Sequence, residues 1–269
     1  MRCAVLGDPI AHSLSPVLHR AGYAALGLDW TYDAVRVPAG GLRALLATTD
    51  ATWRGLSLTM PLKREAMALA DEVSARAALV GAANTLVLVD RQVHADNTDL
   101  PGAVAALRER YDGPVRSATI LGAGATAAST GLALCDLGAT TVTLLARSPE
   151  RADETVAAIA RHPSGPDVRV ASLDDAPTGD VLVSTVPVAA QTPELVARCG
   201  DVPVVFEVLY DPWPTPLASS AVDRTLVGGL DLLVHQAALQ LEIFTGLPAP
   251  LEQMRAAGEA ALAQRRSAP

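Results

Sequence analysis

Short runs of valine and leucine alternate along most of this chain with alanine- and leucine-rich stretches that carry charges at helical spacing. The apolar runs predict strands at residues 3–6, 31–37, 55–58, 85–89, 118–121, 140–145, 181–185 and 204–208. The stretches between them predict helices at residues 16–26, 41–48, 64–70, 126–137, 151–161 and 192–198. Strands separated by helices of this length are typical of βαβ units, in which mainly parallel sheets are covered on both faces. The sequence therefore predicts an α/β protein.

Composition supports a folded chain with a large core. Half of the 269 residues are hydrophobic and 19% are charged, which excludes disorder as the dominant state. The formal net charge of −8 repels phosphate backbones, so neither a nucleic acid nor an anionic membrane is expected as a partner. The three cysteines show no metal-binding or disulfide spacing, and no apolar run is long enough for a signal peptide or a membrane span. We expect a cytoplasmic protein without a metal site.

Two breaks divide the sequence. Leu100-Pro101-Gly102 follows the first group of strands, and Gly228-Gly229 precedes a long apolar helix near the C-terminal end. We therefore expect one domain at residues 101–228 and another at residues 1–100, which residues 229–269 join.

The segment at residues 118–127 reads as a strand, a glycine-rich turn and a helix. The turn Gly122-Ala123-Gly124-Ala125-Thr126-Ala127 has the GxGxxA form of dinucleotide-binding turns. Its first glycine permits the tight turn, its second lets a pyrophosphate approach the backbone, and the small Ala127 lets the helix pack closely on the strand. The turn predicts a dinucleotide site, with an ordinary glycine-rich turn as the alternative.

The next strand ends about 20 residues past this turn, where the ribose of a dinucleotide is recognised. NAD-binding domains place an acid at this strand tip, whereas guanidinium groups suit the 2′-phosphate of NADP. Here the tip carries Ala146, Arg147, Ser148 and Arg151, with no acid before Glu150. The pattern favours NADP over NAD, and solvated surface arginines are the alternative.

Four polar segments lie at strand ends or at a helix start in the first domain, at residues 7–16, 57–63, 81–85 and 96–99. Ligand groups gather at such strand ends in α/β sheets. Ser15, before Pro16, is expected to cap a helix, while Ser13 has no such role; both hydroxyls would suit a substrate carboxylate. Lys63 opens a helix where the helix dipole disfavours a cation, which hints at a function.

Together these segments resemble the signature of the shikimate dehydrogenase family, almost from end to end. The family's GxPIxHSxSPxxH opening matches residues 7–19, its N-V-T-x-P-x-K matches 57–63, its A-N-T matches 83–85 and its N-T-D matches 97–99. Further along, Y-x-P-x-x-T-P-L matches residues 210–217, and G-L-x-x-L-V-x-Q-x-A matches 229–238.

The resemblance implies an oxidoreductase that reduces 3-dehydroshikimate to shikimate with NADPH. It implies a mixed α/β substrate domain and a doubly wound, Rossmann-type NADP domain, with Lys63 and Asp99 as a catalytic dyad at the reacting oxygen. The residues that would bind the substrate are Ser13, Ser15, Thr59, Asn84, Tyr210 and Gln236. The residues that would bind NADP are Gly122, Ala123, Gly124, Ala125, Thr126, Ala146, Arg147, Ser148, Arg151, Val208 and Gly229.

The chain departs from the family pattern at several positions. Ser57 stands where the family has asparagine, Glu207 where an aspartate is common, and Ala146 where an asparagine usually precedes the arginine. The glycine-rich turn reads Gly-Ala-Gly-Ala-Thr rather than Gly-Ala-Gly-Gly-Ala. The change at residue 146 would remove one adenosine contact that the family pattern implies, which bears on cofactor affinity rather than on cofactor type.

Several alternatives remain open at this point. The chain is compatible with an NAD-dependent quinate/shikimate dehydrogenase, and with a regulatory relative that binds a cofactor but has lost its chemistry. Gln236 has a helix-surface position as its alternative, and His12, His19 and His235 are expected to be structural. Apart from the small-molecule substrate, the sequence leaves a homodimer open as a partner.

Overall fold

In a computed structural model, which describes residues 1–267, the chain forms two compact units. Unit 1 comprises Met1–Thr98 and Leu233–Pro269, and unit 2 comprises Asp99–Leu232. The break expected at residues 100–102 is instead part of a continuous helix, α5 (Asp99–Arg110). Pro101 lies in the first turn of this helix, where its missing N–H has no intrahelical partner to lose, so the helix continues through it.

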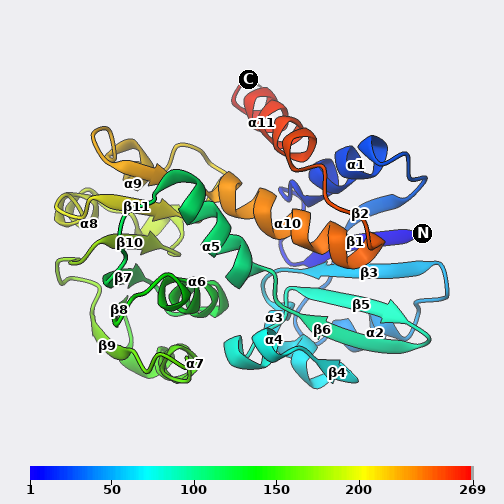
Figure 1. Cartoon of the computed structure of the whole chain (residues 1–269), viewed down its shortest axis with the longest axis horizontal. Coiled ribbons are helices and arrows are strands. Elements are labelled where there is room, and N and C mark those ends of the chain that lie inside the picture. The colour runs from blue at the N-terminus through cyan, green and yellow to red at the C-terminus, as the bar shows by residue number, and fades with distance from the viewer. Residues whose placement is uncertain (268–269) are drawn as a thin grey trace. The chain divides into compact units, whose positions relative to one another are not determined.

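Unit 1 is built around one mixed sheet with the strand order β2-β1-β3-β5-β6-β4 (Figure 1). Its strands are β1 (Arg2–Gly7), β2 (Thr31–Arg36), β3 (Trp53–Leu58), β4 (Glu72–Val73), β5 (Thr85–Val89) and β6 (Gln92–Asp96). Its helices are α1 (Ser15–Ala25), α2 (Leu42–Leu46), α3 (Leu62–Glu65), the 3₁₀ turn η1 (Ala66–Ala68), α4 (Ala75–Val80), α10 (Gly229–Thr245, which begins in unit 2) and α11 (Leu251–Ser267). α1 and α11 pack against each other.

The unit 1 sheet departs from the parallel arrangement at one hairpin. β1 pairs in parallel with β2 and β3, but β5 runs antiparallel to both β3 and β6. Asp90 and Arg91, between β5 and β6, both have positive φ, which is the conformation of a two-residue type I′ turn. Because of this hairpin, the carboxyl end of β6 returns to the start of β5, where Asn84 lies.

Unit 2 contains a parallel sheet with the order β12-β11-β10-β7-β8-β9. Its strands are β7 (Ser117–Leu121), β8 (Thr141–Ala146), β9 (Asp167–Ser172), β10 (Val181–Ser184), β11 (Val204–Glu207) and β12 (Thr225–Val227). After α5 its helices are α6 (Ala125–Asp136), η2 (Pro149–Arg151), α7 (Asp153–Ala160), η3 (Val188–Ala190), α8 (Pro193–Arg198) and α9 (Pro216–Ser219). This is the doubly wound order, and it confirms the Rossmann-type prediction.

The chain reverses its direction of winding between β7 and β10, which pair in the centre of the unit 2 sheet. α6 packs on α5 and α7, whereas α8 packs on α9, as expected when right-handed crossovers cover both faces of the sheet. The core on the α8 side includes Leu121, Leu182 and Val205, all essentially inaccessible. In such sheets ligands bind outside the carboxyl ends of the strands, at this reversal point.

Several predicted elements differ in extent. The helix expected at residues 64–70 is α3 followed by η1, and the helix expected from residue 151 is a 3₁₀ turn before α7. Among residues 1–267, no helix is both long and apolar enough to cross a membrane.

Candidate active site

The ends of β1 and β3 hold the first two polar segments side by side. The N–H of Thr59 donates to Leu6 O at 2.9 Å, and the N–H of Asp8 donates to Met60 O at 3.0 Å. Gly7 is required at this crossing, since a Cβ there would collide with the Thr59 methyl group and the Met60 carbonyl. The segment at residues 7–16 is therefore fixed against the segment that carries Thr59 and Lys63.

The third and fourth polar segments join the second through the backbone of Asn84. Leu58 N donates to Asn84 O at 2.7 Å, and Asn84 N donates to Asp96 O at 3.1 Å. Next to it, Ala83 N donates to Lys63 O at 2.8 Å. Four segments that are distant in sequence thus meet at one end of the unit 1 sheet.

The side chain of Asn84 is buried and fully engaged. Its Oδ1 accepts from the Thr98 N–H at 2.8 Å and from the Thr85 hydroxyl at 2.8 Å, while its Nδ2 donates to Thr98 Oγ1 at 2.9 Å. Nδ2 also lies 3.3 Å from Oε1 of Gln236. Asn84 and Gln236, both predicted to bind substrate, are therefore direct neighbours.

Gln236 is a buried residue, so its helix-surface alternative is wrong. Only 7% of it is exposed, and its Nε2 donates to Leu233 O at 2.8 Å. Since that carbonyl can only accept, the amide is held with its nitrogen toward the helix backbone and its oxygen toward Asn84.

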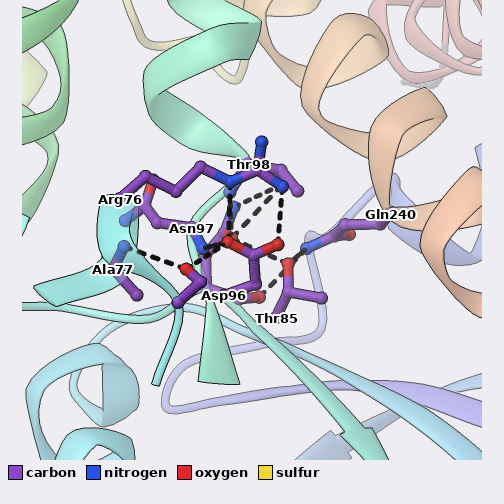
Figure 2. A network of polar contacts seen from close by, with 9 residues as sticks. Arg76, Ala77, Thr85, Asp96, Asn97, Thr98 and Gln240 are labelled. Atoms are coloured by element: carbon purple, nitrogen blue, oxygen red, sulfur yellow. Dashed lines mark hydrogen bonds and ion pairs between the residues drawn. The ribbon is translucent and has the colours of Figure 1, made fainter. Parts of the chain in front are cut away.

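The N-T-D segment is anchored by an ion pair at its first end, shown in Figure 2. Asp96 accepts from Arg76 Nε and Ser74 Oγ, each at 2.6 Å, and from Asn97 N at 2.7 Å. Burial opposes ionisation of this carboxyl, but the hydrogen bonds from Arg76 and Ser74 outweigh it and lower the pKa of Asp96. Asn97 adds a 2.9 Å bond to Ala82 O. Asp99, two residues after Asn97, is 6% exposed and begins α5.

The helix-capping role expected of Ser15 is wrong. α1 begins at Ser15 itself and its N-cap is Leu14, so Ser15 is not the N-cap. Instead the Ser13 hydroxyl accepts from the Ser15 N–H at 3.3 Å. Because Ser13 is the acceptor in this bond, its own proton is directed elsewhere. Ser15 is 5% exposed, and Ser13 is partly buried.

His19 is structural, as expected from the sequence. Its ring stacks on Tyr32 at 4.0 Å, and Nδ1 lies 2.9 Å from Ser15 O, which can only accept, so Nδ1 carries the proton. Burial lowers the pKa of His19 to about 4. Among residues 1–267, no three His, Cys, Asp or Glu side chains group to hold a metal ion.

In unit 2 the glycine-rich turn has the form that a pyrophosphate requires. Gly122, which follows β7, has a φ of +104°, a conformation that favours glycine. Gly124 is the N-cap of α6, and a Cβ on it would point into open space. The turn therefore leaves room at a helix N-terminus, where the dipole favours an anion. Ala127, in the first turn of α6, is fully buried.

The adjacent strand brings the predicted 2′-phosphate residues to the same edge of the sheet. β8 pairs with β7 and ends at the buried Ala146, while Arg147 and Arg151 are exposed and Ser148 is partly so. Ser148 Oγ donates to Glu150 at 2.5 Å, which lowers the pKa of that acid. The guanidinium groups of Arg147 and Arg151, together with the turn, fit NADP.

A third part of unit 2 places Val208 against Gly229. A Cβ on Gly229 would collide with the carbonyl of Val208 and the backbone of Leu209, so the start of α10 lies directly on this loop. The loop, which carries the partly exposed Tyr210, is held by the fully buried Glu207. Glu207 accepts from Gln191 Nε2 at 2.7 Å, Thr215 Oγ1 at 2.9 Å and Leu209 N at 3.1 Å.

Sequence reasoning missed several residues that support these sites. Gln240, Tyr32 and Thr98 complete the hydrogen-bond network around Asn84, and Gln191 completes the one around Glu207. One signal was present for Gln240: it lies four residues after Gln236, and residues at that spacing share a helix face.

Comparisons with known proteins agree with the resemblance found in the sequence. Residues 5–86 match the family model for the shikimate dehydrogenase substrate binding domain, and residues 229–257 match that for the shikimate 5'-dehydrogenase C-terminal domain. The chain is 31% identical to a shikimate dehydrogenase (NADP(+)) of Methanothermobacter thermautotrophicus, over 93% of each chain. It is 34% identical to that of Moorella thermoacetica, over 93% of this chain and 90% of the relative.

Solved structures extend the likeness to three dimensions. Mycobacterium tuberculosis shikimate dehydrogenase is 41% identical and superposes with a TM-score of 0.87 over 97% of this chain and 99% of that one. The Thermus thermophilus enzyme, in a complex with NADP(H) and shikimate, is 31% identical, with a TM-score of 0.87 over 97% of this chain and 100% of that one. The chain belongs to the shikimate dehydrogenase family.

Proposed function

We propose that this enzyme reduces the ring ketone of 3-dehydroshikimate to the hydroxyl of shikimate, with NADPH as the reductant. The observation that carries the proposal is the meeting of four polar segments at one end of the unit 1 sheet, around Asn84, in a chain similar to NADP-dependent shikimate dehydrogenases over more than nine-tenths of its length. When bound, NADPH supplies the hydride that adds to the carbonyl carbon.

In this reaction the side chains of the protein donate a proton and stabilise the developing negative charge. As hydride adds, the carbonyl oxygen becomes negative and must gain a proton to become the hydroxyl. We assign that proton to the ammonium of Lys63, which both stabilises the charge and donates. We assign Asp99 to the second half of the dyad. The lysine is reprotonated from solvent after each turnover.

In the proposed site, uncharged hydrogen-bond donors and acceptors bind the substrate's carboxylate and hydroxyls. Their hydrogen bonds discriminate between the substrate and other ligands. Ser13 and Ser15 are assigned to the carboxylate, since Ser13 has an uncommitted proton and Ser15 lies at the N-terminus of α1. Thr59, Asn84, Tyr210 and Gln236 are assigned to the ring hydroxyls or the carboxylate. Buried amides whose partners are fixed reject ligands that lack a matching group.

The chain's own groups hold NADP in unit 2. The backbone from Gly122 to Thr126 would take the pyrophosphate at the N-terminus of α6, as the open space at Gly124 supports. Ala146, Arg147, Ser148 and Arg151 would surround the 2′-phosphate, where guanidinium groups bind through charge-assisted hydrogen bonds. Val208 and Gly229 would lie beside the nicotinamide.

The test is an absorbance assay of nicotinamide oxidation by the purified protein. We expect rapid NADPH oxidation with 3-dehydroshikimate, and much slower oxidation with 3-dehydroquinate or with NADH in place of NADPH. Equal rates with NADH and NADPH would show that Arg147 does not have the role assigned to it. Tight NADPH binding without any turnover would instead indicate a cofactor-binding protein that has lost its chemistry.

A further inference from the structure

Gln240 occupies the centre of a buried hydrogen-bond network in unit 1. It is 1% exposed and lies on α10, one turn after Gln236. Its Nε2 donates to Asn84 O at 3.0 Å and to Thr85 Oγ1 at 2.9 Å, as Figure 2 shows for Thr85, and its Oε1 accepts from Ser57 Oγ at 2.7 Å. Ser57 in turn accepts from the Tyr32 hydroxyl at 2.5 Å.

Backbone groups fix the orientation of the Gln240 amide. The carbonyl oxygen of Asn84 can only accept, so the group of Gln240 that faces it must be the NH₂. The amide oxygen then faces Ser57, whose hydroxyl must donate to it. With its proton committed, Ser57 can only accept from Tyr32, so the direction of every bond on this side is determined.

The direction of the hydrogen bonds toward Asn84 is determined in the same way. Since Gln240 donates to Thr85 Oγ1, the Thr85 proton is free to point to Asn84 Oδ1, 2.8 Å away. The N–H of Thr98, which can only donate, faces the same oxygen. Asn84 therefore presents Oδ1 to these two donors and turns its NH₂ toward Thr98 Oγ1 and Gln236.

Ser57 is the residue of this network at which the chain departs from the family motif. The shikimate dehydrogenase motif has asparagine at this position, and the shorter serine hydroxyl here fills the gap between Tyr32 and Gln240. All three side chains are buried, so each would lose its hydrogen bond without the others. A buried polar group without a partner is costly, which makes the three a matched set.

We propose that Gln240 is a positioning residue that, through Thr85, helps to fix the amide of Asn84 with its NH₂ directed to Thr98 Oγ1 and Gln236. Its effect on substrate rests on the proposed function. Gln240 need not contact the substrate: together with the Thr98 N–H, which faces the same oxygen, it holds the Asn84 amide in this orientation. Loss of this restraint would weaken substrate binding, because Asn84 and its neighbour Gln236 would no longer be held in one arrangement.

The first test observes the Asn84 side chain directly and needs no substrate. In ¹⁵N-labelled protein, hydrogen exchange of the Asn84 NH₂ is compared among wild type, Thr85→Val, Thr85→Ser and Gln240→Met. We expect exchange about five- to tenfold faster in Thr85→Val and in Gln240→Met, and unchanged in Thr85→Ser, which keeps the hydroxyl. Thr119→Val is the matched control, since Thr119 is a buried threonine of unit 2 with bonds to residue 178.

The outcomes distinguish failure of the positioning role of Gln240 from failure of the proposed function. Wild-type exchange at Asn84 in a folded Gln240→Met protein would overturn the proposal. If that variant does not fold, Thr85→Val decides alone, because the proposal acts through Thr85; unchanged exchange there overturns it equally. If the wild-type protein does not act on shikimate, the proposed function fails, while the exchange result still decides the role of Gln240.

The second test separates positioning from a general structural effect. We expect Thr85→Val to raise the KM for shikimate about tenfold, with kcat and the KM for NADP within about twofold of wild type. In an Asn84→Ala background, Thr85→Val should add nothing further. A full additional tenfold loss in that background would contradict action through Asn84.

Discussion

The backbone N–H of Ala83 donates a 2.8 Å hydrogen bond to the carbonyl oxygen of Lys63. The lysine assigned to the proton is thereby attached, through main-chain atoms, to the residue before Asn84, the amide assigned to the substrate ring. Because this bond uses no side-chain atoms, replacing the Lys63 side chain leaves it in place. Substitution of Lys63 should therefore change the chemical step without displacing the residues assigned to substrate binding.

Arg147 is expected to set the preference for NADP. Removing a guanidinium that binds the 2′-phosphate costs charge-assisted hydrogen bonds, so Arg147→Ala should raise the KM for NADPH about 10- to 100-fold. The KM for NADH, which lacks this phosphate, should change little. Arg116→Ala, at an exposed arginine just before β7, is the matched control. An equal rise for both cofactors would argue against the assignment.

His19 is expected to make unit 1 sensitive to acid. Its pKa is about 4 in the folded protein and 6.5 ordinarily, so the unfolded chain takes up a proton at a higher pH than the folded protein does. The free energy of unfolding should therefore fall as pH drops from about 6.5 to about 4, by roughly 3 kcal/mol from this group. Urea unfolding of wild type and His19→Phe across this range checks it. The variant should lose this part of the pH dependence, and identical profiles would refute it.

Glu207 is expected to hold the loop that carries Tyr210. Glu207→Ala leaves the donors of Gln191, Thr215 and Leu209 without their acceptor, which should lower the free energy of unfolding by about 2–4 kcal/mol. Glu207→Asp, which restores the residue common in the family, should lose much less. Thermal unfolding of the two variants makes the comparison. Equal losses would show that the carboxylate is not what holds the loop.

The sequence predicted the central strands well because these are continuous apolar runs. It missed the short edge strands β4 and β12, and it missed β6 and β9. β6 and β9 alternate polar and apolar residues and are partly exposed; β9 lies at a sheet edge and β6 beside β4. Missing β6 concealed the hairpin that returns Asp96 to Asn84. A strand pattern typical of a parallel sheet does not indicate that one pair of its strands is antiparallel.

The candidate site could be predicted only as far as its segments. Motifs placed Asn84, Lys63 and Gln236 in it, but which side chains hold them depends on contacts between distant residues. Ser57 and Gln240 are 183 residues apart and bond directly. Ser15 was mistaken for an N-cap because Pro16 after it is typical of one, and only the backbone of α1 shows otherwise.

The central claim is that Lys63 supplies the proton to the reduced carbonyl. It is tested most directly by the kcat of Lys63→Ala for 3-dehydroshikimate reduction by NADPH, measured beside the dissociation constant of shikimate. We predict a kcat lower by about 10²–10⁴-fold, with shikimate affinity changed far less, because Asn84 and Gln236 keep their positions. A variant that retains near wild-type kcat would contradict the account.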